Sequence, residues 1–391
     1  MSIDQHDYKS IKSNNGQRFS PKYQRVVIKV GTTLLTDGSK QLAPNVMSKI
    51  VEQIAILHSS DVQVLLVTSG AVAAGRHVLG ITSEHRNIPL RQIMAAVGQS
   101  RLMQEYEKLF DSHNINIAQA LLSRRDLKDR LGYLNIRNTI LGLTGHKVLP
   151  IINENDVVAV EELSGESFGD NDTLSAMVAN LVDADLLIIL GEIEGLYTKD
   201  PNIHSDAALI PIVEHISQND VTTLGGPSWQ SRGQGGMSTK LEAARLAAAS
   251  GINVVIASGR LDNSIVNLVS GENIGTLFPA TNSKLESRKR WMLSGLSNKS
   301  QIIIDSGAIH AISNQNGSLL AAGITKIEGS FERGDIVSLF DNTITQVACG
   351  ITNYDSRELS KIKGHHSHEI AEILGHHYGD EIIHRNNMVL I

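Results

Sequence analysis

A glycine pair and a lysine stand at the start of a segment rich in alanine and leucine. The glycines open Gly235-Gly236-Met237-Ser238-Thr239-Lys240, and the segment continues to Ala249. We predict a helix here, capped by Ser238 and closed by Gly251. A helix start attracts anions. Lys240 places a cation there, against the helix dipole, and a residue that breaks such a local rule often belongs to a functional site. The pattern indicates an anion site, although a plain helix cap with a solvated lysine would look the same.

A second lysine, Lys29, interrupts the apolar run Val26–Val30. Burial of its charge is costly unless an anion meets it. On an edge strand, however, the stem would pack while the amine reached water, and the sequence leaves both alternatives open. Gly31 follows the run, where a bare backbone would let N–H groups approach a phosphate.

An acidic cluster leads into a further helical pattern. Gly169-Asp170-Asn171-Asp172 precedes Thr173–Val178. Asp170 or Asp172 can serve as the helix N-cap. Two carboxylates and an amide exceed what capping needs, so the surplus would orient lysines or hold an ammonium group.

These residues need a scaffold, which the alternation of short apolar runs with helical patterns supplies. Runs of Val, Ile and Leu are typical of strands buried on both faces, and their alternation with helices predicts a mostly parallel sheet covered on both sides. The predicted strands are 26–30, 64–67, 115–118, 148–152, 186–190 and 254–257, and the predicted helices include 46–57, 92–110 and 173–181.

Polar residues follow several of these strands. In such sheets, ligands bind beyond the carboxyl ends of the strands. Several polar turns at one edge therefore predict a pocket there, formed by 29–31, 68–70, 153–156, 191–192 and 258–259.

The 391 residues suffice for two domains. We predict a flexible extension over 1–22, an α/β domain over 23–280, a polar linker over 281–296 and a small β-rich domain over 297–391. Short apolar runs with glycine turns mark strands in the last domain, at 302–304, 318–321, 336–340 and 345–348.

Composition excludes several classes of protein. A net charge of −6 argues against a protein that coats nucleic acid. Cys349 is the one cysteine, so no internal disulfide can form, and a reducing compartment is expected. Because Met1–Tyr23 lacks the apolar core of a signal peptide and no apolar run is long enough to cross a bilayer, we expect a cytoplasmic protein without membrane contact.

Common site motifs are absent. The sequence contains neither a Walker A pattern nor G-x-G-x-x-G, and no cysteine cluster or H-E-x-x-H indicates zinc. Histidines gather near the C-terminus, but they are mixed with glutamates in a helix-and-turn stretch, so metal binding there is disfavoured; they are His365, His366, His368, His376 and His377.

From Tyr23 onward the chain resembles the glutamate 5-kinases of the amino acid kinase superfamily, with a C-terminal part similar to a PUA domain. The segments that carry the resemblance are 27–32, 67–76, 95–99, 152–156, 169–172, 194–197 and 235–240. Each segment alone is a weak indication of the family, but together they are highly specific for it. The resemblance implies a three-layer α/β/α kinase domain and a PUA-like β domain.

The resemblance also implies an activity: phosphorylation of the L-glutamate γ-carboxylate by ATP with Mg²⁺, giving L-glutamyl 5-phosphate in the first step of proline biosynthesis. It further implies inhibition by proline and assembly into dimers or tetramers. By this resemblance Lys29, Lys240 and Asp172 are catalytic, and Ser69, Gly70, Asp156 and Asn171 bind glutamate. The implied ATP site comprises Lys29, Gly31, Gly191, Glu192, Gln234, Gly235, Gly236, Met237, Ser238, Thr239 and Lys240.

Two departures from the family pattern fall on the nucleotide side. Gly191-Glu192 stands where Thr-Asp is usual, and Gln234 stands in a Gly-Thr-Gly-Gly-Met motif in place of threonine. The segment between Asp156 and Gly169, near which proline acts in the family, is slightly longer than usual.

Two other functions compete with this one. Another carboxylate or carbamate kinase would share the lysines and differ at Ser69, Asp156 and Asn171. An RNA-binding protein is suggested by the PUA-like part. Residues 301–391, however, hold six Lys or Arg against eleven Asp or Glu, a balance of −5, which disfavours RNA binding.

Overall fold

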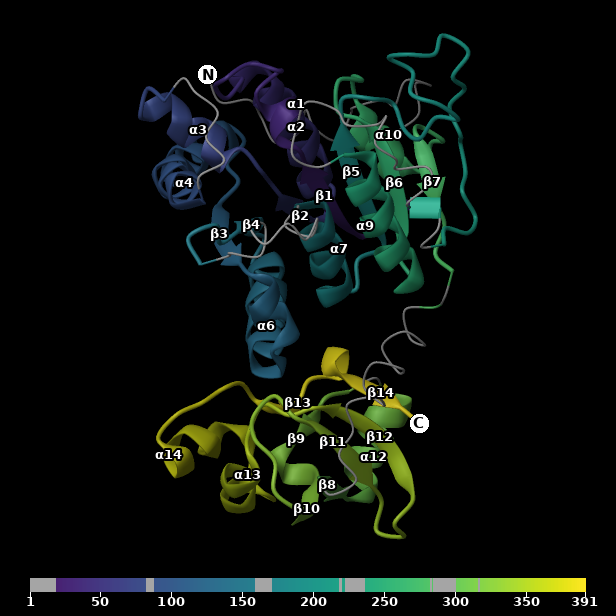
Figure 1. Ribbon diagram of the computed structural model, residues 1–391. Coiled ribbons are helices and arrows are strands. Elements are labelled where there is room, and N and C mark those ends of the chain that lie inside the picture. The colour runs from purple at the N-terminus through teal and green to yellow at the C-terminus, as the bar shows by residue number, and fades with distance from the viewer. Residues whose placement is uncertain are drawn as a thin grey trace. The chain divides into compact units, whose positions relative to one another are not determined.

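The computed structural model describes residues 19–81, 88–158, 171–217, 220–221, 236–281, 283, 300–315 and 317–391. The chain divides into two compact units. The first comprises Met1–Leu127 and Arg137–Asn282, and the second comprises Lys128–Ile136 and Ser283–Ile391. Figure 1 shows the elements of each unit.

The described strands of the first unit form one seven-stranded sheet in the order β3-β4-β2-β1-β5-β6-β7. All neighbours pair in parallel except β6 and β7, which are antiparallel. The strands are β1 (Arg25–Val30), β2 (Gln63–Val67), β3 (Ile117–Leu122), β4 (Leu149–Glu154), β5 (Leu186–Gly191), β6 (Asn253–Ser258) and β7 (Thr276–Phe278).

Helices cover both faces of this sheet (Figure 1). These helices are drawn from α1 (Thr32–Leu35), α2 (Pro44–Ser59), α3 (Ala71–Val78), α4 (Ile88–Asp111), α7 (Asn171–Leu181), α9 (Met237–Ala249) and α10 (Ser264–Ser270). Two further helices, α5 (Arg124–Lys128) and α6 (Arg130–Gly145), follow β3, and α6 projects away from the sheet (Figure 1). The predicted three-layer α/β/α architecture with a mostly parallel sheet is confirmed.

Alternation along β1 decides which side chains reach which face. Val26, Ile28 and Val30 join the apolar core shared with α2, α4 and α10. Lys29 therefore projects from the opposite face of the strand, where α7 lies against β1. Because β1 is the middle strand of the sheet, the edge-strand alternative for Lys29 is wrong.

Two strands of the first unit differ from prediction. The expected strand at 115–118 begins at Ile117, because Ile115 closes a turn after α4 through its N–H bond to Phe110 and packs in the core. The short antiparallel strand β7 was not predicted, since three residues show no periodicity.

The second unit is rich in strands, as predicted. A five-stranded sheet has the order β10-β8-β11-β12-β14, and β13 pairs with β9. Its strands are β8 (Gln301–Ile304), β9 (Leu319–Leu320), β10 (Ile324–Glu328), β11 (Ile336–Phe340), β12 (Gln346–Ile351), β13 (Glu381–Ile383) and β14 (Met388–Leu390). Its helices are α12 (Ser306–Asn314), α13 (Ser356–Ile362) and α14 (Ile370–Leu374). Cys349 is buried in this unit with Ile336 and Ile351.

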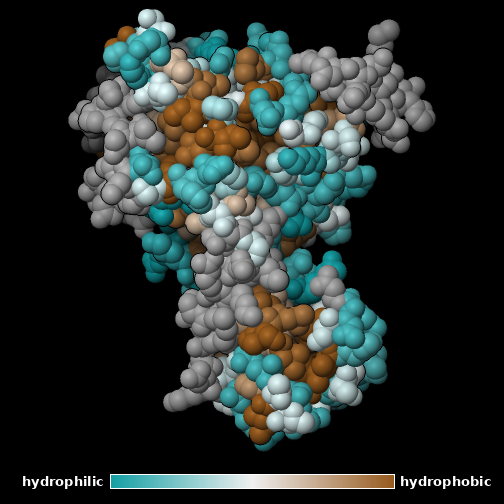
Figure 2. All heavy atoms as spheres, turned by 90° about the vertical axis from the view of Figure 1, so that its right-hand side faces the viewer, coloured by the Kyte–Doolittle hydropathy of each residue, from teal (hydrophilic) through white to brown (hydrophobic). Residues whose placement is uncertain are grey.

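Figure 2 shows one face of each unit, on which apolar side chains gather in a patch bordered by polar ones. Within the described parts of the chain, no helix combines the length and apolar character that crossing a bilayer requires.

Candidate active site

One buried carboxylate joins two lysines that are far apart in the sequence. Lys29 Nζ lies 2.5 Å from Asp172 Oδ1, and Lys240 Nζ lies 3.2 Å from Asp172 Oδ2. Thr239 also donates its hydroxyl to Asp172 Oδ2 over 2.9 Å. The residues come from β1, the first turn of α7 and the first turn of α9. Two ammonium groups therefore converge on one point.

Burial and charge act in opposite directions on Asp172. Complete burial alone would raise the pKa of its carboxyl group, but Lys240, Lys29 and the hydroxyl of Thr239 outweigh that effect and lower the pKa below its usual range. The carboxylate is therefore ionised at neutral pH. With both lysines protonated, the cluster carries one net positive charge, which suits a phosphate ligand.

The start of α7 explains why Asp172 is available to the lysines. The helix begins at Asn171, so Asp172 lies inside the first turn, and the prediction that it could be the N-cap is wrong. Asp170, the other candidate cap, lies outside the described residues.

The start of α9 also differs from the prediction. Its N-cap is Gly236 in an extended conformation, without a side-chain capping bond, and Met237 is the first helical residue. The predicted cap, Ser238, lies two residues beyond the actual cap and is already the second residue of the helix. The helix start therefore lacks a side-chain acceptor of its own at the cap. Gly251, just beyond the helix end, has φ +84° and closes it as predicted.

Two glycines border the lysine amines. A Cβ atom at Gly31 would lie 3.6 Å from Lys29 Nζ, and one at Gly191 would lie 3.5 Å from Lys240 Cε. They follow and end the neighbouring strands β1 and β5. A larger side chain at either position would therefore occupy space next to Lys29 or Lys240.

The acidic residue after Gly191 forms an ion pair with an arginine that a second carboxylate shares. Glu192 lies 3.0 Å from Arg260, which also lies 2.6 Å from Asp37. Among the other residues of the expected ATP site, Gly236 and Met237 lie at the start of α9, whereas Gln234 and Gly235 fall outside the described residues.

Next to the lysine cluster, Asn171 and Ser69 meet. Asn171 Nδ2 donates to Ser69 Oγ over 2.9 Å and to Asn153 Oδ1 over 3.0 Å. Gly70 then adopts φ +101° as the cap of α3, a conformation that favours glycine. The structure thus brings three of the expected glutamate-binding residues, Ser69, Gly70 and Asn171, together just after β2 and at the start of α7.

Asp156 lies two residues beyond β4 and is partly buried. Burial raises the pKa of its carboxyl group, and the positive charge of Arg91 offsets part of that rise. The chain is described as far as Val158, and residues 159–170, which follow, lie outside the described residues.

The sequence analysis placed Asn153 in the polar turn 153–156 of the predicted pocket but gave Gln99 no role. Asn153 Nδ2 donates to Gln99 Oε1 over 2.9 Å, and both residues are buried. The available signal was a glutamine on the buried side of α4, close to Met94, Ala95 and Leu102.

The helix that carries Gln99 crosses α3 at two glycines. A Cβ at Gly98 would lie 1.8 Å from the carbonyl oxygen of Ala71, and a Cβ at Gly75 would lie 1.8 Å from that of Met94. Only glycine permits this approach. The crossing fixes Gln99 close to the start of α3, where Ser69 and Gly70 precede it.

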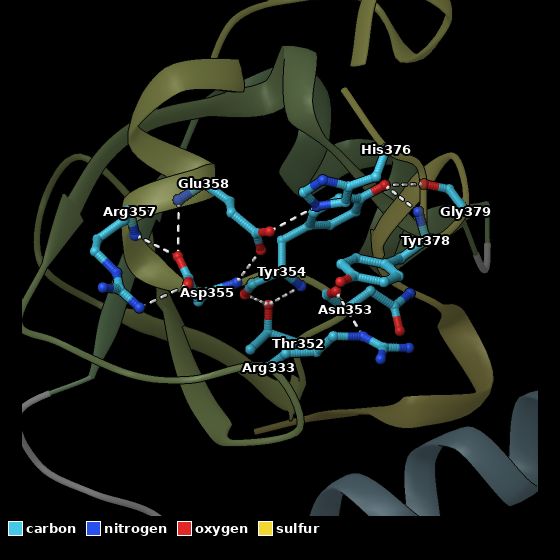
Figure 3. A network of polar contacts seen from close by, with 10 residues as sticks. All are labelled: Arg333, Thr352, Asn353, Tyr354, Asp355, Arg357, Glu358, His376, Tyr378 and Gly379. Carbon is cyan, nitrogen blue, oxygen red and sulfur yellow. Dashed lines mark hydrogen bonds and ion pairs between the residues drawn. The ribbon is translucent and has the colours of Figure 1, made fainter. Parts of the chain in front are cut away.

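The C-terminal histidines do not gather into one site. Figure 3 shows His376 beside Glu358, at 2.7 Å, and Arg333 over the ring of Tyr378, 4.0 Å from its centroid. His365 and His377 pair instead with Glu369 and Asp380. No cluster of three His, Cys, Asp or Glu suited to a metal ion occurs within the described part of the chain.

Comparison with known proteins gives the class. The chain matches the amino acid kinase family over residues 24–258 and the PUA domain over residues 300–374. Among solved structures, a UMP kinase from Bacillus anthracis is 17% identical, with a TM-score of 0.46, and covers 67% of this chain and 98% of its own.

Curated relatives narrow the class to one group. A glutamate 5-kinase of Dehalococcoides mccartyi is 51% identical over 94% of this chain and 99% of its own length. Those of Herpetosiphon aurantiacus and Deinococcus radiodurans are 46% and 44% identical, each over 94% of this chain and 98% and 100% of their own. The chain therefore belongs to the glutamate 5-kinases of the amino acid kinase family.

Proposed function

We propose that this protein transfers the γ-phosphoryl group of ATP to the side-chain carboxylate of L-glutamate, giving L-glutamyl 5-phosphate and ADP in the first step of proline biosynthesis. The observation that carries the proposal is the convergence of Lys29 and Lys240 on Asp172, directly beside the Asn171–Ser69 contact. The two lysines suit the transferring phosphoryl group, and the Asn171–Ser69 pair suits the amino acid.

The chemistry needs charge more than proton transfer. A carboxyl group with a pKa of about 4.3 is already ionised at neutral pH, so its oxygen can attack the γ-phosphorus without a general base. The bond from phosphorus to the bridging oxygen of ADP breaks, and ADP leaves. The obstacle is repulsion between two anions, about 4 kcal/mol for each pair of unit charges at 4 Å in an environment of dielectric 20.

The two lysines act on that repulsion. Lys29 and Lys240 would neutralise charge on the transferring phosphoryl group and the leaving oxygen, as positioned cations do in phosphoryl transfer. Asp172 would hold both amines in place. Gly31, Gly191 and the start of α9 (Gly236 to Lys240) would line the triphosphate, and Glu192 would lie at its edge with Arg260.

Mg²⁺ would arrive with the nucleotide. The acidic residue in the cluster, Asp172, already faces two lysines and a hydroxyl. The donors for the metal would therefore be phosphate oxygens and water, which Mg²⁺ favours. When bound, the metal neutralises phosphate charge.

On the acceptor side, Asn171 and Ser69 would orient the amino acid, and Asp156 would hold its ammonium group. We further propose that proline binds at or near this side and raises the glutamate concentration needed for half-maximal rate. We also propose that the protein self-associates, since Val78 at the end of α3, Leu79 just after it and Ile93 on α4 expose apolar side chains.

The test is formation of acyl phosphate, trapped as hydroxamate, with ATP and a series of acceptors. Glutamate should give product, whereas N-acetylglutamate, aspartate and carbamate should give little. A preference for one of the other three would overturn the assignment of the substrate. Added proline and size-exclusion chromatography with light scattering test the inhibition and the self-association.

A further inference from the structure

A chain of side-chain amides runs from α4 to the start of α7. Gln99 Oε1 accepts from Asn153 Nδ2, and Asn153 Oδ1 accepts from Asn171 Nδ2. Asn153 is 2% exposed and Gln99 is 9% exposed. Three amides in sequence are a costly arrangement in a protein interior unless each group finds a partner.

The backbone fixes which way these amides face. The N–H of Glu154 donates to Asn153 Oδ1 over 2.9 Å, so the oxygen of Asn153 must face that group and its nitrogen must face Gln99. Gln99 consequently offers its oxygen to Asn153 and turns its Nε2 away. The orientation of Gln99 thus follows from a backbone donor in β4.

Two atoms at the ends of this chain have no partner among the described residues. They are Gln99 Nε2, a donor, and Asn171 Oδ1, an acceptor. Both are buried, and a buried polar group without a partner costs about 1–3 kcal/mol. A donor and an acceptor on either side of the Asn153 amide match the carboxylate and the ammonium group of an α-amino acid.

The place of Gln99 in the sheet decides which carboxylate it can reach. Asn153 lies on β4, which is separated from β1 by β2. Two strand spacings amount to roughly 10 Å, so Gln99 lies at the far end of the site from Lys29. The reacting carboxylate belongs at the lysines, and the other carboxylate of the amino acid therefore lies toward Gln99.

We propose that Gln99 is a specificity-determining residue, whose Nε2 donates a hydrogen bond to the α-carboxylate of the bound amino acid while its Oε1 holds Asn153 in place. This inference rests on the proposed function. It assigns to Gln99 the recognition of an acceptor with carboxylates at both ends.

Two substitutions separate direct contact from an indirect role. Gln99→Glu keeps an oxygen for Asn153 Nδ2 and replaces the donor with a second carboxylate oxygen, whereas Gln99→Met removes both functions. Direct contact predicts that the KM for glutamate rises about tenfold or more in Gln99→Met and further in Gln99→Glu, because a hydrogen bond to a charged group is lost and then replaced by repulsion. The KM for ATP should stay within twofold in both.

A role through Asn153 alone predicts the reverse order, with Gln99→Glu close to the wild type and Gln99→Met impaired. That order would overturn the proposal. A second readout uses 4-aminobutyrate, which lacks the α-carboxylate, as an inhibitor that competes with glutamate. If Gln99 contacts the α-carboxylate, the inhibition constant of 4-aminobutyrate should be unchanged in Gln99→Met. An equal loss of affinity for 4-aminobutyrate and glutamate contradicts direct contact.

Gln53 provides the matched control. It is a buried glutamine on α2 whose Oε1 accepts from the N–H of Ile265 and whose Nε2 donates to the carbonyl of Lys49. Gln53→Glu and Gln53→Met report the general cost of these changes on thermal unfolding without altering the KM for glutamate. If the wild type makes no glutamyl hydroxamate, the proposed function fails; if it does and neither Gln99 variant changes the KM for glutamate, only the present inference fails.

Discussion

Lys29 and Lys240 lie on different oxygens of the same carboxylate, that of Asp172, and they differ in exposure. The side chain of Lys29 is 3% exposed and that of Lys240 is 13% exposed. The buried lysine comes from the middle strand of the sheet, and the more open one comes from a helix start. The two amines thus combine a rigid position with an accessible one.

This difference predicts distinct consequences for the two lysine substitutions. Lys240→Ala and Lys29→Ala should each lower kcat by about 10²–10³, the range seen when one positioned donor is removed from a reacting centre. Lys240→Ala should leave the unfolding temperature within a few degrees of the wild type, while Lys29→Ala should lower it more, because it also empties a packed position. Hydroxamate formation and thermal unfolding measure the two effects, and near wild-type turnover in either variant would remove that lysine from the mechanism.

Asp172→Asn should lower stability and turnover together. Removing one partner of a buried ion pair leaves uncompensated charge and typically costs about 3–5 kcal/mol. Here two ammonium groups would face each other without a carboxylate between them. Because the triphosphate can replace the missing anion, ATP should raise the unfolding temperature more in Asp172→Asn than in the wild type. Equal shifts in the two proteins would show that the nucleotide phosphates do not reach these lysines.

Asp156 predicts an acid-side dependence of glutamate binding. Its folded pKa is raised, so its ionised form is disfavoured by folding, and any stability from the protonated form is lost as the pH rises through the raised value. The ionised form is the one that would bind an ammonium group. As pH falls through that raised pKa, the KM for glutamate should therefore increase while the KM for ATP stays nearly constant.

The pKa of Asp172 is shifted the other way, so its contribution is present above the ordinary aspartate pKa and is lost only as pH falls through the lowered value. It does not titrate in the same pH window as Asp156.

Asp156→Asn should give a high KM for glutamate with little pH dependence. A dependence of KM on pH that is unchanged from the wild type would contradict the role of this carboxylate.

Gly98→Ala should destabilise the first unit and disturb the amino-acid side of the site. The added methyl group would lie 1.8 Å from the backbone oxygen of Ala71, so α3 and α4 must separate, at a cost of about 3 kcal/mol or more. Gly142→Ala, in α6, is the control, because no atom lies within 4 Å of its added Cβ, and it should stabilise by about 0.5–1 kcal/mol. Chemical denaturation of both variants measures the difference, and equal stability would show that the crossing tolerates a methyl group.

The strands around the site were predictable because burial on both faces leaves a plain signature: runs of Val, Ile and Leu such as 26–30 and 186–190. The site was predictable in part for the opposite reason, since Lys29 and Asp172 break the apolar or capping pattern around them. What local pattern does not provide is pairing over distance. Gln99 looks like one polar residue on a helix until the fold places it against Asn153, and Ser238 looks like a cap until Gly236 supplies the entry to the helix.

The same limit applies to short elements. The strands β7, β10, β13 and β14 were not predicted, because runs of three to five residues carry little periodicity and form only when a partner strand is in place. Their existence depends on tertiary contact more than on local preference.

The order in which the three charged residues are translated has a consequence for how the protein is made. During synthesis Lys29 emerges from the ribosome first, Asp172 much later and Lys240 last, because β1, α7 and α9 follow one another along the chain. A nascent chain that stops before α9 has only Lys29 to pair with Asp172, because Lys240 lies on α9. Under the proposed function, the complete charge cluster can therefore form only after α9 has been synthesised.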